Sequence, residues 1–160
     1  MGNLDYADRS DFEDAERGFV AALSPAVVRT DDGRVIWDGD AYAFLDGDCP
    51  DNAHPSLRRQ SRLCNKQGLF EVTEGICQVR NLDLSNMSLV EGDTGVIVID
   101  PLIFTETAAA ALALYREHRV ERPVTGLIYT HSHGDHFGGS RGVLPHGHAP
   151  VPALAPAGFL

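Results

Sequence analysis

The chain has 160 residues, a length that suits one domain of ordinary size. Its formal net charge of −10 argues against nucleic acid or an anionic membrane as a partner, because both are bound through basic side chains. The acidity is uneven, since residues 1–56 hold 13 of the 23 acidic side chains but only 4 of the 13 basic ones. No apolar run approaches the ~20 residues that a membrane-spanning helix needs.

The first part of the sequence, residues 1–64, is predicted to be an acidic, turn-rich segment that precedes the main fold. Residues 11–23 predict a short amphipathic helix, because apolar side chains recur there at helical spacing, namely Phe12, Ala15, Phe19 and Ala22. Residues 34–37 and 42–45 lie between Asp-Gly turns, and we interpret them as short strands or packed loops.

The number and spacing of the cysteines and the sequence of the N-terminus both indicate the cellular compartment of the protein. The three cysteines, Cys49, Cys64 and Cys77, include no CxxC pair and are odd in number, so we expect reduced, partly buried thiols rather than a disulfide framework. The first residues lack both the basic and the apolar region of a secretory signal. We therefore expect a cytoplasmic protein.

Residues 65–160 show a clearer pattern of strands. The runs 69–73 and 76–80 flank a Glu-Gly turn and predict a β-hairpin. The runs 87–91 and 96–100 predict a second antiparallel pair. The last run is apolar on both faces, so we expect it to be a buried central strand.

A crossover helix is predicted next. Thr105 is expected to cap a helix over residues 106–119, which Pro123 closes, and residues 124–129 predict another buried strand. A strand, a helix and a strand in this order indicate a βαβ unit, whose functional loop follows the second strand at its carboxyl end.

That loop contains three histidines and a carboxylate within six residues: His131, His133, Asp135 and His136. Imidazole nitrogen and carboxylate oxygen are good ligands for zinc and similar divalent ions. Four such groups this close together cannot all reach one ion without distortion, so the spacing favours two adjacent ions that share a hydroxide. A surface histidine cluster that binds no metal is the alternative.

The loop sequence THSHGDHFGG resembles the HxHxDH signature of the metallo-β-lactamase-fold hydrolases. Further segments resemble the alkyl sulfatases of this superfamily, which hydrolyse linear alkyl sulfate esters such as dodecyl sulfate; they are DFEDAERGF, PSLRRQSRL, QGLFEVTEGICQVRNLDLSNMSLVEGDTGVIVIDPL, ETAAAALALYREHR and APAGFL. The resemblance runs from about residue 11 to residue 160 and implies an α/β (α+β) protein with an αββα sandwich. Residues 65–160 would form the N-terminal half of that sandwich, truncated before its second sheet.

The resemblance also implies roles for single residues. His131 and His133 would hold one zinc ion, and Asp135 and His136 would help to hold a second. Asp135 would also position the attacking water as a catalytic residue. Asp100 matches the acidic residue that ends the strand before the crossover helix, and we expect it to orient the ligand loop by hydrogen bonding.

The activity implied is cleavage of an alkyl sulfate ester to an alcohol and sulfate by a metal-activated hydroxide. Members of the family are expected to be homodimers at full length, whereas this part alone is expected to be inactive and marginally stable. Two alternatives stay open, a non-catalytic metal-binding remnant and another hydrolase of the same fold. We interpret His146 and His148 as part of a proline-rich connection rather than as replacement ligands.

Overall fold

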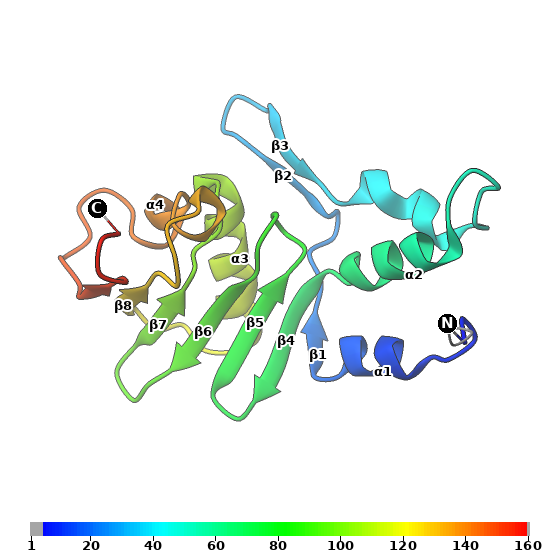
Figure 1. Ribbon diagram of the computed structural model, residues 1–160. Coiled ribbons are helices and arrows are strands. Elements are labelled where there is room, and N and C mark those ends of the chain that lie inside the picture. Colours follow the sequence, from blue (N-terminus) through cyan, green and yellow to red (C-terminus); the bar gives the residue numbers. More distant parts are fainter. Residues whose placement is uncertain (1–4, 160) are drawn as a thin grey trace.

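The computed structural model describes residues 5–159 and contains a seven-stranded sheet with helices beside it (Figure 1). The strands lie in the order β1-β4-β5-β6-β7-β8-β9, with bounds Phe19–Ala21, Gly68–Thr73, Ile76–Arg80, Met87–Glu91, Val96–Ile99, Val124–Ile128 and Ala153–Leu154. Pairing is antiparallel from β1 to β7 and parallel from β7 to β9. Both predicted antiparallel pairs are therefore confirmed.

The predicted βαβ unit is also confirmed, because α3 (Thr105–His118) connects the parallel strands β7 and β8. The expected cap is wrong, since Thr105 is already inside the helix and Phe104 holds the N-cap position without a side-chain cap bond. The buried carboxylate of Asp83 accepts hydrogen bonds from the main-chain N–H groups of Ile103 and Phe104 instead. A carboxylate from a distant loop thus accepts hydrogen bonds from main-chain N–H groups at the start of this helix.

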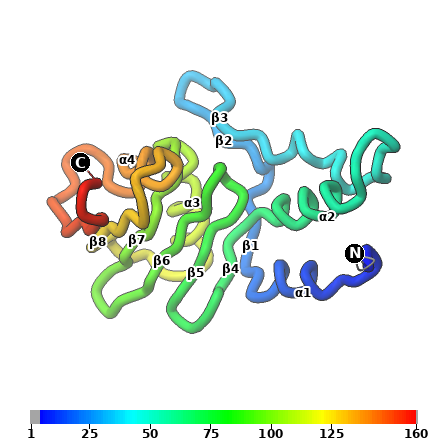
Figure 2. Tube along the Cα trace, viewed as in Figure 1, coloured from blue at the N-terminus to red at the C-terminus, as the bar shows by residue number. Residues whose placement is uncertain are grey.

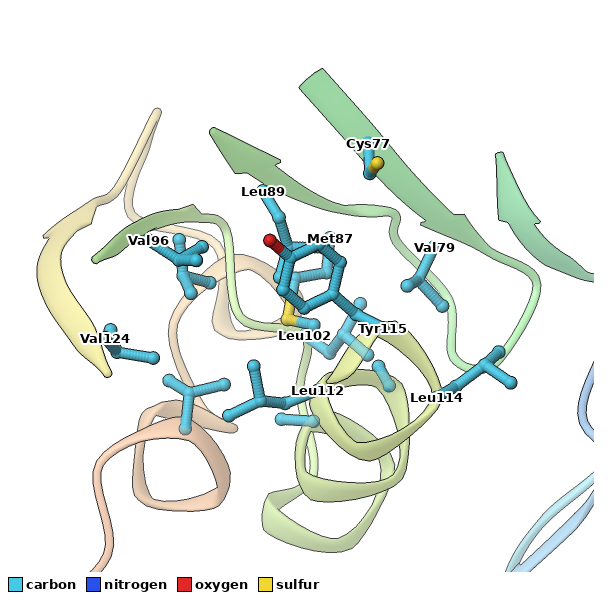
Figure 3. Close-up of a cluster of buried hydrophobic side chains, with 14 of the residues drawn as sticks. Cys77, Val79, Met87, Leu89, Val96, Leu102, Leu112, Leu114, Tyr115 and Val124 are labelled. Atoms are coloured by element: carbon cyan, nitrogen blue, oxygen red, sulfur yellow. The ribbon is translucent and has the colours of Figure 1, made fainter. Parts of the chain in front are cut away.

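The hydrophobic core lies between α3 and one face of the sheet (Figure 3). Met87 and Leu89 from β6 and Val96 from β7 meet Leu112 and Tyr115 from the helix. All five are at most 4% exposed, so this interface supplies most of the apolar burial that holds β6, β7 and the helix together.

The strand β7 is central in the sheet, but the expectation that it is buried on both faces is wrong. Val96 and Val98 are buried against α3, whereas Ile97 is 39% exposed on the opposite face. Successive side chains of a strand point to opposite faces, and the helix packs on only one of them. Within residues 5–159, the side chains of β7 are therefore fully buried on one face of the sheet only.

The predicted helix over residues 11–23 is shorter than expected. The helix α1 spans only Ser10–Glu16, and Phe19–Ala21 forms the strand β1 at the edge of the sheet beside β4. Gly18 makes the change of direction with a φ of 73°, and a side chain there would place its Cβ 2.0 Å from the carbonyl oxygen of Glu71. Pairing with β4 replaces the second half of the expected helix.

The remaining N-terminal elements form a small second sheet and two helical segments. Strand β2 (Val27–Arg29) pairs with β3 (Val35–Asp38), which confirms a strand near residues 34–37. Residues 42–45 lie in the 3₁₀ helix η1 (Asp40–Asp46), and the helix α2 (Pro55–Cys64) was not predicted.

The three cysteines are free in the structure. Cys77 is buried, but Cys49 and Cys64 are exposed, so the expectation of partial burial is wrong for those two. Among residues 5–159, no helix has the length and apolar character needed to cross a membrane.

Candidate metal centre

The histidine-rich loop leaves the carboxyl end of β8 and leads into the short helix α4 (Ser140–Val143). Figure 2 traces this path and shows the loop on the same side of the sheet as the segment that joins β7 to α3. The loop contains one 3₁₀ turn, η2 (Gly134–His136). The two neighbouring parallel strands thus bring their carboxyl ends, and the residues that follow them, to one place.

Asp100, directly after β7, is the residue that joins the two ends of the loop. Its Oδ1 accepts a hydrogen bond from the main-chain N of Thr130 at 2.8 Å, and its Oδ2 accepts from Thr130 Oγ1 at 2.6 Å. The same Oδ2 accepts from His136 Nδ1 at 2.9 Å. Asp100 is only 7% exposed and has a φ of 54°, a conformation that Asp and Asn adopt more readily than most residues.

One arrangement of protons satisfies all of these contacts when Asp100 is ionised. An ionised carboxylate only accepts, so Thr130 Oγ1 and His136 Nδ1 both donate to Asp100. Thr130 Oγ1 then accepts from His131 Nδ1 at 2.9 Å, and His131 Nε2 accepts from His133 Nδ1 at 3.1 Å. In this pattern the ring nitrogen without a proton is Nε2 in His131, His133 and His136, and that of His131 is already the acceptor for His133.

The structure brings all four predicted ligand side chains together. The ring centre of His131 lies 4.0 Å from that of His136 and 4.6 Å from that of His133. Asp135 Oδ2 lies 3.4 Å from His136 Nε2. The rings of His131 and His136 and the carboxylate of Asp135 are half-buried, while His133 is exposed.

This donor set fits zinc chemically, but the side chains are not arranged around a common point. Among the described residues, no group of three or more His, Cys, Asp or Glu side chains has the arrangement of a metal site. The contact between His131 Nε2 and His133 Nδ1 must open before His131 Nε2 can bind an ion. Zinc ligation by these residues therefore stays a prediction, as does the catalytic role of Asp135.

Two glycines allow the loop to pack closely against the segment after β7. A Cβ at Gly139 would lie 2.2 Å from the carbonyl oxygen of Pro101, and one at Gly138 would lie 2.4 Å from that of Ile103. The main-chain N of Gly139 donates to the carbonyl oxygen of Leu102 at 3.0 Å. Larger residues at either glycine would separate the two segments.

The loop between β5 and β6 supports the site, and sequence reasoning did not identify it. Ser85 Oγ donates to the main-chain carbonyl oxygen of Asp135. Asp83, which is 3% exposed, accepts from the start of α3 and from the hydroxyl of Thr107. The sequence signal here is a set of polar residues between two predicted strands, and that does not reveal partners far along the chain.

Aromatic side chains join the end of β8, the loop and the C-terminal segment. Phe159 stacks on Tyr129 with ring centres 5.4 Å apart and meets Phe137 edge-on at 5.3 Å. Tyr129 Oη also lies 3.0 Å from Ser140 Oγ. His146 and His148 are exposed in the irregular connection between α4 and β9, where the sequence placed them.

Comparisons with known proteins agree on the type of fold. Residues 80–158 match the family model of the metallo-β-lactamase superfamily. A linear primary-alkylsulfatase of a Pseudomonas species is 50% identical over 100% of this chain, and an alkyl/aryl-sulfatase of Saccharomyces cerevisiae is 45% identical over 98% of it. The solved structure of the inverting sec-alkylsulfatase Pisa1 from Pseudomonas matches 98% of the chain at 47% identity, with a TM-score of 0.89.

These matches confirm the fold class and the resemblance that the sequence implies. Over its length the chain has the mixed α/β, metallo-β-lactamase fold of the alkylsulfatases. It spans about a quarter of the relatives, covering 24% of the primary-alkylsulfatase and 25% of the Pisa1 chain. The resemblance is therefore to a portion of these enzymes, as expected for their N-terminal part.

Proposed function

We propose that this chain, whose sequence and fold match those of alkylsulfatases along its length, supplies part of the metal centre of an alkyl sulfatase. The observation that carries the proposal is the hydrogen-bond pattern around Asp100. By holding Thr130 and the Nδ1 atom of His136, Asp100 leaves the Nε2 atom of His136 as the ring nitrogen that can bind a metal ion.

In this proposal the metal is zinc, and the complete enzyme holds two ions. His131 and His133 hold one ion, and Asp135 and His136 contribute to the other. Bound zinc supplies a nucleophile at neutral pH and neutralises negative charge that develops in the transition state. Asp135 positions the attacking water, and Asp100 keeps His136 in the orientation and tautomer that ligation requires.

The proposed substrate is a linear alkyl sulfate ester of the dodecyl sulfate type, which is cleaved to an alcohol and sulfate. The names of the relatives support a sulfate ester, since they include a primary- and a secondary-alkylsulfatase. The complete enzyme is proposed to act as a homodimer.

A second candidate function is a metal-binding remnant without catalysis. It is favoured by the contact between His131 Nε2 and His133 Nδ1, because the described residues do not present an assembled group of ligands. Another hydrolase of the same fold is a third candidate, and the alkylsulfatase relatives at 45–50% identity make it the weakest.

The test measures zinc content and dodecyl sulfate hydrolysis for this chain and for a longer chain that includes the downstream reading frame. We expect zinc in both proteins and turnover in the longer one, with zinc binding weakened and turnover abolished by His131→Ala. Turnover by the longer protein that survives His131→Ala would contradict the proposal. Zinc binding without turnover in both would favour the remnant.

A further inference from the structure

Four arginines line a small cavity in the N-terminal part of the protein. The cavity has a volume of about 260 Å³ and lies between residues 6–12 and the helix α2. Its basic residues are Arg9, Arg58, Arg59 and Arg62. Figure 1 shows α1 and α2 at the opposite end of the molecule from α4, so this cavity is separate from the candidate metal centre.

Three of the guanidinium groups surround one aromatic ring. The central carbons of Arg9 and Arg59 each lie 5.2 Å from the ring centre of Phe12, and that of Arg62 lies 5.5 Å from it. Phe12 is buried, so its ring excludes water from one side of the group. Cation–π attraction favours each contact singly, but like charges held this close repel one another.

Acidic side chains balance this charge only in part. Arg59 Nη1 pairs with Asp11 Oδ2 at 2.6 Å, and its Nη2 donates to the main-chain oxygen of Asp8. Within residues 5–159, the side chains of Arg9 and Arg62 make no hydrogen bond or ion pair, although each contacts the ring of Phe12. Of the residues that line the cavity, four are basic and one, Asp8, is acidic. Asp11 pairs with Arg59 beside the cavity, and Glu16 lies within electrostatic range of Arg9.

The buried arginine of the cavity uses main-chain oxygens and no carboxylate. Arg58 is 9% exposed, and its terminal nitrogens donate to the carbonyl oxygens of Leu45, Gly47 and Asp48. The Nε atoms of Arg58 and Arg59 are buried and have no hydrogen-bond partner in the part of the chain that the structure describes. Buried N–H groups are normally satisfied, so these two leave hydrogen-bonding capacity unused beside the cavity.

We propose that this cavity binds a small tetrahedral oxyanion, either sulfate or phosphate. Guanidinium groups present several N–H donors in one plane, a geometry that matches the oxygens of these anions. A water molecule occupies about 30 Å³ of liquid, so the cavity has room for one such anion with a few waters. Because the chain as a whole has a net charge of −10, a cavity lined by four arginines stands out from its general acidity. This inference does not rest on the proposed function.

The test is a comparison of salts at equal ionic strength on the full 160-residue chain at micromolar concentration. Sodium sulfate and sodium phosphate are expected to raise the melting temperature above its value in sodium chloride, because a ligand of the folded state stabilises it. Titration calorimetry with sulfate gives the dissociation constant directly. The same titration with methyl sulfate shows whether the cavity accepts only the free dianion or also the sulfate group of an ester.

Arg62→Gln and Arg9→Gln remove one charge each without touching the buried Arg58, and Arg34→Gln is the matched control on an exposed arginine outside the cavity. We expect sulfate to bind at least fivefold more weakly to both cavity variants and unchanged to the control. An equal sulfate response in all three variants, or no response of the unmodified chain beyond that of chloride, would overturn the proposal. Circular dichroism verifies that each variant keeps its fold.

Discussion

Ser85 Oγ donates a hydrogen bond to the main-chain oxygen of Asp135, which lies 50 residues further along the chain. The contact joins the β5–β6 loop to the predicted ligand loop through the backbone of a predicted ligand. The same short loop holds the start of α3 through Asp83. One segment therefore supports the helix behind the candidate site and also the loop that forms it.

Replacement of Ser85 by alanine is expected to weaken zinc binding about tenfold, because residues that orient ligands affect metal affinity to this extent. Ser88→Ala is the control, since among residues 5–159 the hydroxyl of Ser88 bonds only to the side chain of Gln78, within the sheet. Competition with a zinc-chelating dye measures both affinities. Equal affinities in the two variants would show that the bond to Asp135 does not influence the loop.

The variant Asp100→Asn separates charge from backbone conformation at this position. Asparagine tolerates the φ of 54°, but its amide offers one acceptor oxygen where the carboxylate offers two. We expect zinc affinity to fall by roughly ten- to a hundredfold with the fold retained. The same dye competition, with the exposed Asp93→Asn as control, checks this, and an unchanged affinity would remove Asp100 from the site.

Asp83→Ala is expected to destabilise the protein by about 3 kcal/mol, because the buried hydroxyl of Thr107 and two part-buried main-chain N–H groups at the start of α3 lose their acceptor. Asp93→Ala, in the exposed turn between β6 and β7, is expected to change stability by less than about 0.5 kcal/mol. Urea unfolding followed by circular dichroism in the absence of metal measures both. A loss below about 1 kcal/mol for Asp83→Ala would mean that water satisfies these donors.

Glu91 gives the fold a specific dependence on pH. Its hydrogen bond with Arg119 holds the pKa of the Glu91 carboxyl below the ordinary value of 4.5, despite partial burial. A depressed folded-state pKa contributes stability above pH 4.5 that is lost as pH falls through the folded-state value. Glu91→Gln is therefore expected to lose less stability than the unmodified protein between about pH 5 and about pH 3.

Urea unfolding at several pH values checks this expectation, with Glu121→Gln as the control on an exposed carboxyl. The control is expected to follow the unmodified protein at each pH. If Glu91→Gln also follows it, other carboxylates account for the acid sensitivity of the fold. Glutamine at position 91 still accepts from the hydroxyl of Tyr115, so the comparison isolates the ionised group.

The elements that sequence reasoning predicted well have strong local signals. The hairpin of β4 and β5, the crossover helix and the strand β8 all follow from periodicity and turn residues. The proximity of His131, His133 and His136 follows from their spacing in one loop. The role of Asp100 as an orienting residue came from the resemblance, and its bond to His136 agrees with that role.

What the sequence could not predict depends on contacts between distant segments. Phe19 has helical spacing from Phe12, yet it lies in a strand because the edge of β4 is available for pairing. Asp83 and Ser85 occupy a turn in which polar residues are ordinary, and their partners lie 20 or more residues away. The exposure of Ile97 likewise depends on what packs over the sheet, which an apolar strand pattern does not specify.

The chain order of these contacts has a consequence for synthesis. Ser85, Asp100 and Leu102, which hold the ligand loop by hydrogen bonds, all precede it in the sequence. Since a nascent chain leaves the ribosome from its N-terminus and begins to fold in that order, the supporting frame is already outside when His131 emerges. The loop therefore meets hydrogen-bonding partners that were synthesised before it, whereas β9 and Phe159, which pack beside β8 and Phe137, are added afterwards.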